Sequence, residues 1–64
     1  MNPPLASYSI TACFRALRID CGNVAAASVA EAISRMKERK AAWAAKALSC
    51  RVEQIVWEAE EDFL

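Results

Sequence analysis

The sequence lacks histidine and contains one glycine and two prolines among its 64 residues. Without histidine, a serine or cysteine nucleophile has no ordinary general base, and a single glycine excludes a glycine-rich phosphate-binding loop. We therefore expect no catalytic residues, no cofactor and no small-molecule substrate. The protein is predicted not to be an enzyme.

Cysteine is also scarce. There are three cysteines, which is an odd number and too few for a secreted disulfide scaffold: Cys13, Cys21 and Cys50. A zinc site is not expected either, because there is no CxxC pair and no histidine to complete four tetrahedral ligands. The sequence shows neither a signal peptide nor a run of about 18 apolar residues. A cytoplasmic protein without a membrane segment is predicted.

The chain is short for a protein that has neither disulfides nor a metal. At this length a single core rarely supplies more than roughly 3–5 kcal/mol of net stability. Burial of surface against another chain is the remaining source of stability. We therefore expect a protein partner, which would be a second copy in a homodimer or a larger protein.

The C-terminal two thirds of the chain have the composition of a helix. From residue 23 to residue 64 there is no glycine or proline, and Ala, Glu, Lys, Arg and Leu make up more than half of the residues. Asn23 is a possible N-cap, and Ser28 is an alternative because Glu31 follows it in a capping-box arrangement. We predict one long helix over residues 23–62, continuous or kinked near residues 37–41.

The segment before Gly22 fits two periodicities. Helical spacing relates Ile10, Cys13, Phe14 and Leu17, whereas strand-like alternation relates Tyr8, Ile10, Ala12 and Phe14. We favour a short helix over residues 7–20, with a strand as the alternative, and a flexible N-terminus over residues 1–6. The predicted fold is all-α: a helical hairpin or bundle that dimerisation or a partner completes.

Two series of apolar residues run along the predicted long helix. The first series changes face near the middle of the helix. Ile33 and Met36 belong to its first half, and its second half is rotated from them around the helix axis by about 110°. A second series recurs every seven residues and consists of Val29, Met36, Trp43, Cys50, Trp57 and Leu64. A lone hairpin could not cover both series, so we predict a partner interface. Its residues are Met36, Trp43, Leu48, Cys50, Val52, Ile55 and Trp57.

The net charge of zero hides a division along the chain. Residues 1–51 contain all eight cations and three acids, whereas residues 52–64 contain five acids and no cation. We expect the two oppositely charged segments to meet within or between chains. The alternative is a phosphate-binding surface. Its candidate nucleic-acid contacts are Arg35, Lys37, Arg39 and Lys40.

These features together predict a small non-catalytic protein–protein interaction module. It would be an accessory regulator, an inhibitor or a chaperone, acting as a helical dimer or bound to a larger protein. The alternative prediction, from a different class, is a small dimeric DNA-binding transcriptional regulator that uses Arg15, Arg18 and the basic run of residues 35–40.

Overall fold

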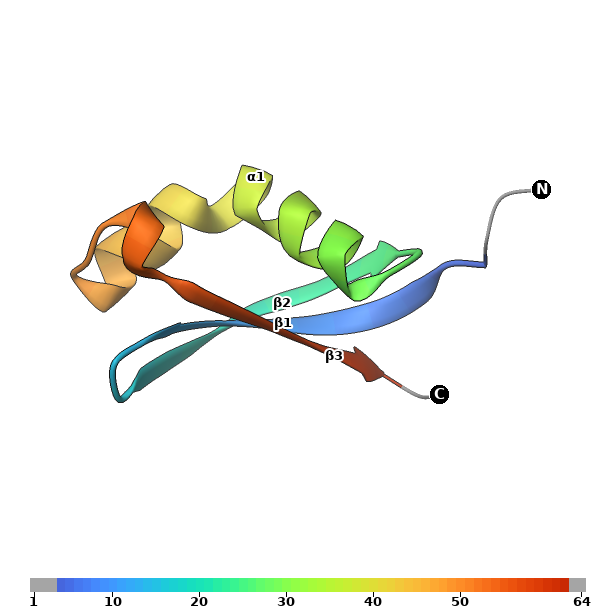
Figure 1. The fold of residues 1–64 in the computed structure, drawn as a ribbon, viewed down its shortest axis with the longest axis horizontal. Helices are drawn as coiled ribbons and strands as arrows, with labels where there is room; N and C mark the ends of the chain where they lie inside the picture. The colour runs from blue at the N-terminus through green and yellow to red at the C-terminus, as the bar shows by residue number, and fades with distance from the viewer. Residues whose placement is uncertain (1–3, 63–64) are drawn as a thin grey trace.

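The computed structural model describes residues 4–62 and shows a three-stranded sheet with one long helix on one of its faces (Figure 1). Along the chain the elements are β1 (Ala6–Phe14), β2 (Leu17–Ala26), α1 (Val29–Leu48), the short 3-10 helix η1 (Val52–Gln54) and β3 (Val56–Asp62). The strand order is β2-β1-β3, and the central strand β1 is antiparallel to both neighbours.

The predicted all-α fold, with its helical hairpin or bundle, is wrong. Residues 7–20 lie in a β-hairpin rather than in a helix. The predicted long helix of residues 23–62 is helical from Val29 to Leu48, without a break at residues 37–41, and its last part forms η1 and β3. Residues 1–3 of the predicted flexible N-terminus lie outside the described residues, and Ala6 begins β1.

The hairpin follows the strand-like alternation of the N-terminal segment. Tyr8, Ile10 and Ala12 of β1 are buried, and the residues between them have hydroxyl side chains. Phe14 pairs with Leu17 across a two-residue turn. Arg15 has φ 56°, the positive value that the first central residue of a type II′ turn requires and that glycine usually supplies. The turn therefore has no glycine to mark it in the sequence.

The single glycine lies in a β-bulge of β2 instead of in a turn. Ile10 pairs with Gly22 whereas Thr11 pairs with Asp20, so Cys21 is the additional residue on β2. Gly22 has φ 97°, and its N–H donates to Asp20 Oδ1 at 2.8 Å. The bulge shifts the alternation of β2 by one residue, which lets both Cys21 and Val24 enter the core.

Both ends of α1 are capped by serines. Ser28, one of the two caps that the sequence predicts, accepts the Glu31 N–H on its side chain at 3.1 Å. At the other end Ser49 is left-handed with φ 55°, and Cys50 N–H donates to the Ala45 carbonyl at 3.0 Å. This is a Schellman arrangement with serine where glycine is usual, so the end of the helix also lacks its ordinary signal.

The core lies between α1 and the sheet. Its largest fully buried side chains are Ile10 from β1, Cys21 from β2 and Leu48 from α1. The buried residues of α1 change face along the helix: they are Ala32 and Met36 in its first half and Ala44, Ala45 and Leu48 in its second half. This change arises because α1 contacts β1 and β2 and also η1 and β3, to which the chain returns after Leu48.

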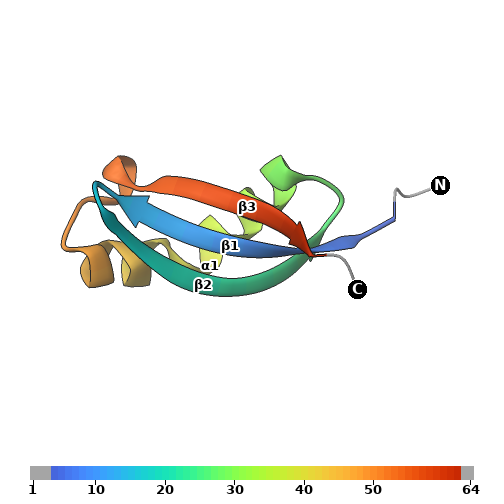
Figure 2. The same ribbon diagram turned by 90° about the horizontal axis from the view of Figure 1, so that it is seen from below.

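The other face of the sheet is open. Figure 2 shows the three strands from below, with α1 crossing obliquely behind them from the β3 side at its N-terminus to the β2 side at its C-terminus. No helix or strand among residues 4–62 covers the near face. Within the same residues, no helix is both long enough and apolar enough to span a membrane.

Leu48→Asp should unfold the protein, because it would place an unpaired carboxylate at a fully buried position at a cost of several kcal/mol. Urea denaturation followed by circular dichroism measures the change. Arg39→Ala, at an exposed position of the same helix, is the control and should change the free energy of unfolding by less than about 0.5 kcal/mol. Equal losses in the two variants would contradict this assignment of the faces of α1.

Gly22→Ala should lower the free energy of unfolding by about 1–2 kcal/mol, because an L-residue is strained at this positive φ. Crowding does not contribute, since a Cβ at Gly22 would meet nothing within 4 Å. The matched control is chemically synthesised protein with D-alanine at position 22, which adds the same methyl group but favours positive φ. If the D-alanine protein keeps the stability of the wild type and Gly22→Ala does not, the backbone conformation is the cause of the loss.

Candidate functional site

Trp43 is the large aromatic side chain that α1 leaves outside the core. It is 50% exposed, although it lies seven residues after the buried Met36. At about 100° per residue, Trp43 is almost in line with Met36. It points away from Ala44 and Leu48, however, which face the core in this half of the helix. The change of buried face along α1 therefore leaves Trp43 in solvent.

Cations surround Trp43 on the helix surface. Its neighbours at the i±3 and i±4 positions are Arg39, Lys40, Lys46 and Ala47. The Nζ atom of Lys40 lies 4.9 Å from the centroid of the Trp43 ring, within cation–π range. We call Arg39, Lys40, Trp43 and Lys46 the Trp43 patch. It combines a large apolar surface with three positive charges and no acid.

The open face of the sheet has the opposite charge. Ser7, Ser9 and Thr11 of β1 form a central row of hydroxyl groups, which pair with acidic residues of β3. One cation and four acids lie on this face, giving a net charge of −3. We call this surface the acidic face. Its charged residues are Arg18, Asp20, Glu58, Glu60 and Asp62.

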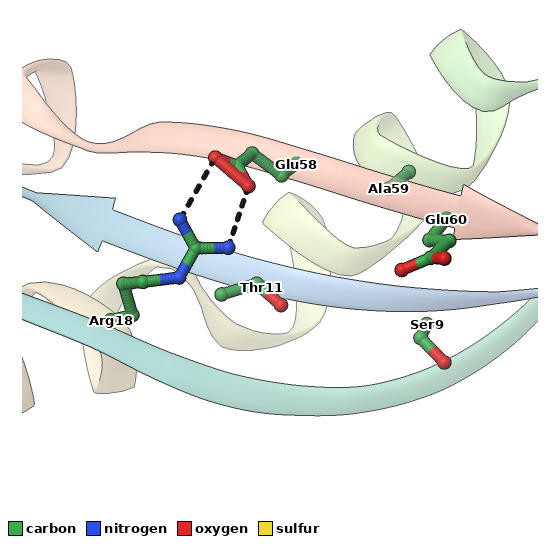
Figure 3. Close-up of a pocket in the computed structure, with 6 residues that line it drawn as sticks. All are labelled: Ser9, Thr11, Arg18, Glu58, Ala59 and Glu60. Carbon is green, nitrogen blue, oxygen red and sulfur yellow. Dashed lines mark hydrogen bonds and ion pairs between the residues drawn. The ribbon is translucent and has the colours of Figure 1, made fainter.

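An ion pair bridges the two outer strands at one end of the acidic face. Arg18 of β2 donates to both carboxylate oxygens of Glu58 on β3, at 2.7 and 3.3 Å (Figure 3). The hydrogen bond and charge of Arg18 lower the pKa of Glu58, and the hydrogen bond from the Arg18 guanidinium to Glu58 raises the pKa of Arg18. The Cys13 thiol also contacts this carboxylate, with 3.6 Å between Cys13 Sγ and Glu58 Oε2. Burial raises the pKa of the Cys13 thiol.

A second network ties the three strands together at the other end of the acidic face. The Ser9 hydroxyl lies 2.9 Å from each carboxylate oxygen of Asp62. The Asn23 side-chain amide donates to the same carboxylate and, at 3.3 Å, to Ser9. Asp62 is therefore held by neutral donors, and its negative charge is not neutralised by a cation within residues 4–62.

A shallow depression of about 280 Å³ lies between these two networks. Its lining residues come from all three strands, as Figure 3 shows: Ser9, Thr11, Arg18, Glu58, Ala59 and Glu60. Within the described part of the chain, Glu60 has no side-chain hydrogen bond and no ion pair. The depression thus offers hydroxyl groups and a free carboxylate, a combination that suits a ligand with donors and positive charge. Nowhere in residues 4–62 do three His, Cys, Asp or Glu side chains group as metal ligands.

The structure separates the residues of the predicted partner interface. Met36, Leu48 and Ile55 are 2%, 1% and 8% exposed and belong to the core, so a partner cannot reach them in this conformation. Cys50 and Trp57 are half-buried beside the core. The exposed members are Trp43 and Val52. The structure therefore leaves Trp43, together with its cations, as the main accessible part of that set.

The four candidate nucleic-acid contacts do not share one surface. Arg35 forms an ion pair with Glu31 at 2.6 Å and donates to the Ala25 carbonyl at 3.2 Å. Lys37 lies about 200° around the helix from Arg35. Arg39 and Lys40 belong to the Trp43 patch. The basic run is therefore spread around the helix, with one of its cations already paired.

No family model matches this chain, and neither does any curated protein or solved structure that was compared with it. The two surfaces are therefore interpreted from their own chemistry. Sequence reasoning missed the acidic face, because residues 56–62 were assigned to the long helix. The available signal was the alternation of Trp57 and Ala59 with Glu58 and Glu60, which is the period of a strand.

Arg18→Ala should raise the pKa of Glu58 toward its ordinary value, because the hydrogen bond and charge that favour the carboxylate are removed. The change is measured by NMR titration of the Glu58 side-chain carboxyl. In the wild type, a lowered folded-state pKa contributes stability above the ordinary pKa of glutamate, and this is lost as the pH falls through the lowered pKa. Arg39→Ala, on the other layer, should leave the Glu58 titration unchanged. An unchanged pKa in Arg18→Ala would show that the ion pair does not form in solution.

Proposed function

We propose that the protein is a non-catalytic protein–protein interaction module and that the Trp43 patch of α1 is its contact surface. The observation that supports this most directly is the exposure of Trp43, half of whose side chain is in water on the outer face of a helix. The module would act as an accessory regulator, an inhibitor or a chaperone. Its partner would present an acidic surface with a recess for the indole ring.

The energetic argument starts from the tryptophan. Burying the exposed half of this side chain against a partner would remove a large apolar area from water, at roughly 25 cal/mol per Å². Tryptophan is among the residues that most often dominate the binding energy of an interface. The exposed half of the ring contributes little to the stability of the fold, so its burial can contribute to the binding free energy of a complex.

The cations around Trp43 determine the chemistry of the partner. Arg39, Lys40 and Lys46 flank the ring without an intervening acid, and they favour encounter with a negatively charged surface. A nucleic acid would also present negative charge. However, Glu38 interrupts the basic run, and Glu31 already pairs with Arg35, so a continuous phosphate contact along the helix is weakened. An acidic protein surface with a recess for the indole ring matches the mixture of ring and cations better.

Trp43→Ala should abolish binding to the partner while the fold is retained. Tagged wild-type and variant proteins would be used to capture partners from a nuclease-treated lysate of the native host. Loss of a central tryptophan commonly costs at least about 2 kcal/mol, or roughly 30-fold in Kd. A protein captured by the wild type should therefore be absent, or strongly reduced, with Trp43→Ala.

Lys37→Ala is the matched control, because it removes an exposed cation of α1 that lies outside the Trp43 patch. It should capture the partner as the wild type does, and both variants should give the circular dichroism spectrum of the wild type. Equal capture by Trp43→Ala and the wild type would overturn the proposal. Capture that occurs in an untreated lysate and is lost in the nuclease-treated one would assign the patch to nucleic acid and would overturn the proposal as well.

A further inference from the structure

We infer that a partner of the Trp43 patch is the acidic face of a second copy, so that molecules associate head to tail. This inference rests on the proposed function of α1 and adds the identity of the partner surface. The observations that lead to it are the charges of the two surfaces, the depression on the acidic face and the position of the two surfaces on opposite sides of the molecule.

The two surfaces match in charge. The Trp43 patch contains three cations and no acid, a charge of +3, and the acidic face has a net charge of −3. They lie on opposite sides of the two-layer fold, with the helix above the sheet and the acidic face below it (Figures 1 and 2). Within residues 4–62, no ion pair joins them. The charges of the two surfaces can therefore meet between copies but not within one.

The depression on the acidic face suits the Trp43 side chain. Ser9 and Thr11 form its floor, and the flanking Arg18 and Glu58 are held in place by their ion pair (Figure 3). An indole ring lying there would place its N–H near Glu60, whose carboxylate has no partner within the described chain. Lys40 and Lys46 on either side of the ring would approach Glu60 and Asp62.

The dimensions of the two surfaces also agree. Strands β1 and β2 are 9 and 10 residues long, or about 30 Å, which is the length of the 20-residue helix α1. Two spacings between three strands amount to about 10 Å, close to the diameter of a helix with its side chains. One helix can therefore lie along the open face of one sheet.

Pairing of strand edges is a less suitable way for copies to meet. Antiparallel pairing of two β3 strands would bring two acidic segments together, since Glu58, Glu60 and Glu61 lie on this edge strand. The other edge strand, β2, contains the bulge at Gly22, which interrupts regular pairing. The helix and the open face are the surfaces that remain.

Two different surfaces on opposite sides of a molecule form a heterologous contact, which leaves one free copy of each surface at the ends of every assembly that is not closed into a ring. Association should therefore continue beyond a dimer as concentration rises. A contact one helix wide on a three-stranded sheet is smaller than a standard interface, so it should be weak and reversible. Because it joins exposed opposite charges, it should also weaken as salt is added.

Analytical ultracentrifugation of the whole chain, at concentrations up to about 1 mM, tests the inference. The weight-average mass of the wild type should rise continuously past that of a dimer. It should fall back to the monomer when salt is raised from about 0.01 M to about 1 M, which shortens the screening length from roughly 30 Å to roughly 3 Å.

Two variants test the head-to-tail geometry. Trp43→Ala combined with Lys46→Ala removes the helix surface, and Glu60→Lys removes the centre of the acidic face. Each variant alone should remain monomeric under conditions in which the wild type assembles. An equimolar mixture should form a dimer and nothing larger, because each molecule keeps one of the two complementary surfaces. Lys37→Ala, as the control, should assemble as the wild type does.

Three results would overturn the inference: a wild type that stays monomeric at low salt, a closed dimer whose mass does not rise with concentration, and a mixture of the two variants that stays monomeric. Circular dichroism of each variant shows whether it is folded, and a folded variant pair is required for the mixing result. These failures are distinct from failure of the proposed function, which depends on capture of a partner by Trp43 in the lysate experiment.

Discussion

The packing of α1 on one face of the sheet is the interaction on which the other features depend. It buries alternate residues of β1 against the helix and leaves the intervening residues on the opposite face. It also fixes which side of α1 is buried: the side of Met36 in the first half of the helix and the side of Leu48 in the second half. Because this covered side changes, Trp43 falls outside the core although its position in the seven-residue series matches that of Met36. Both candidate surfaces are consequences of this one contact.

The same packing separates charge across the molecule. Five of the eight cations lie on α1 and four of the eight acids on β3, so much of the division that is visible along the sequence becomes a division between two layers. Arg18 lies on β2, and its ion pair with Glu58 joins the two outer strands across the central one. The other acids of the acidic face are held by neutral donors or have no partner among residues 4–62, which keeps the open face negative.

The sequence predicted local features better than it predicted the fold. The cap at Ser28 and the change of apolar face between Met36 and Leu48 could be recognised, because both depend on residues close together in the chain. The turns could not, because Arg15 and Ser49 adopt positive φ values without glycine, and the glycine that marks most turns lies in a bulge. With no visible turn after residue 48, the strand-like alternation of residues 56–62 was counted as part of a helix.

The central strand has a further consequence for how such a protein can change. Its even-numbered residues, such as Ile10 and Ala12, hold the molecule together, while the odd-numbered residues beside them, such as Ser9 and Thr11, face solvent. Neighbouring positions on one strand are therefore under different structural constraints. Substitutions in the hydroxyl row would change the chemistry of the open face, while the helix-facing half of the same strand stayed as it is.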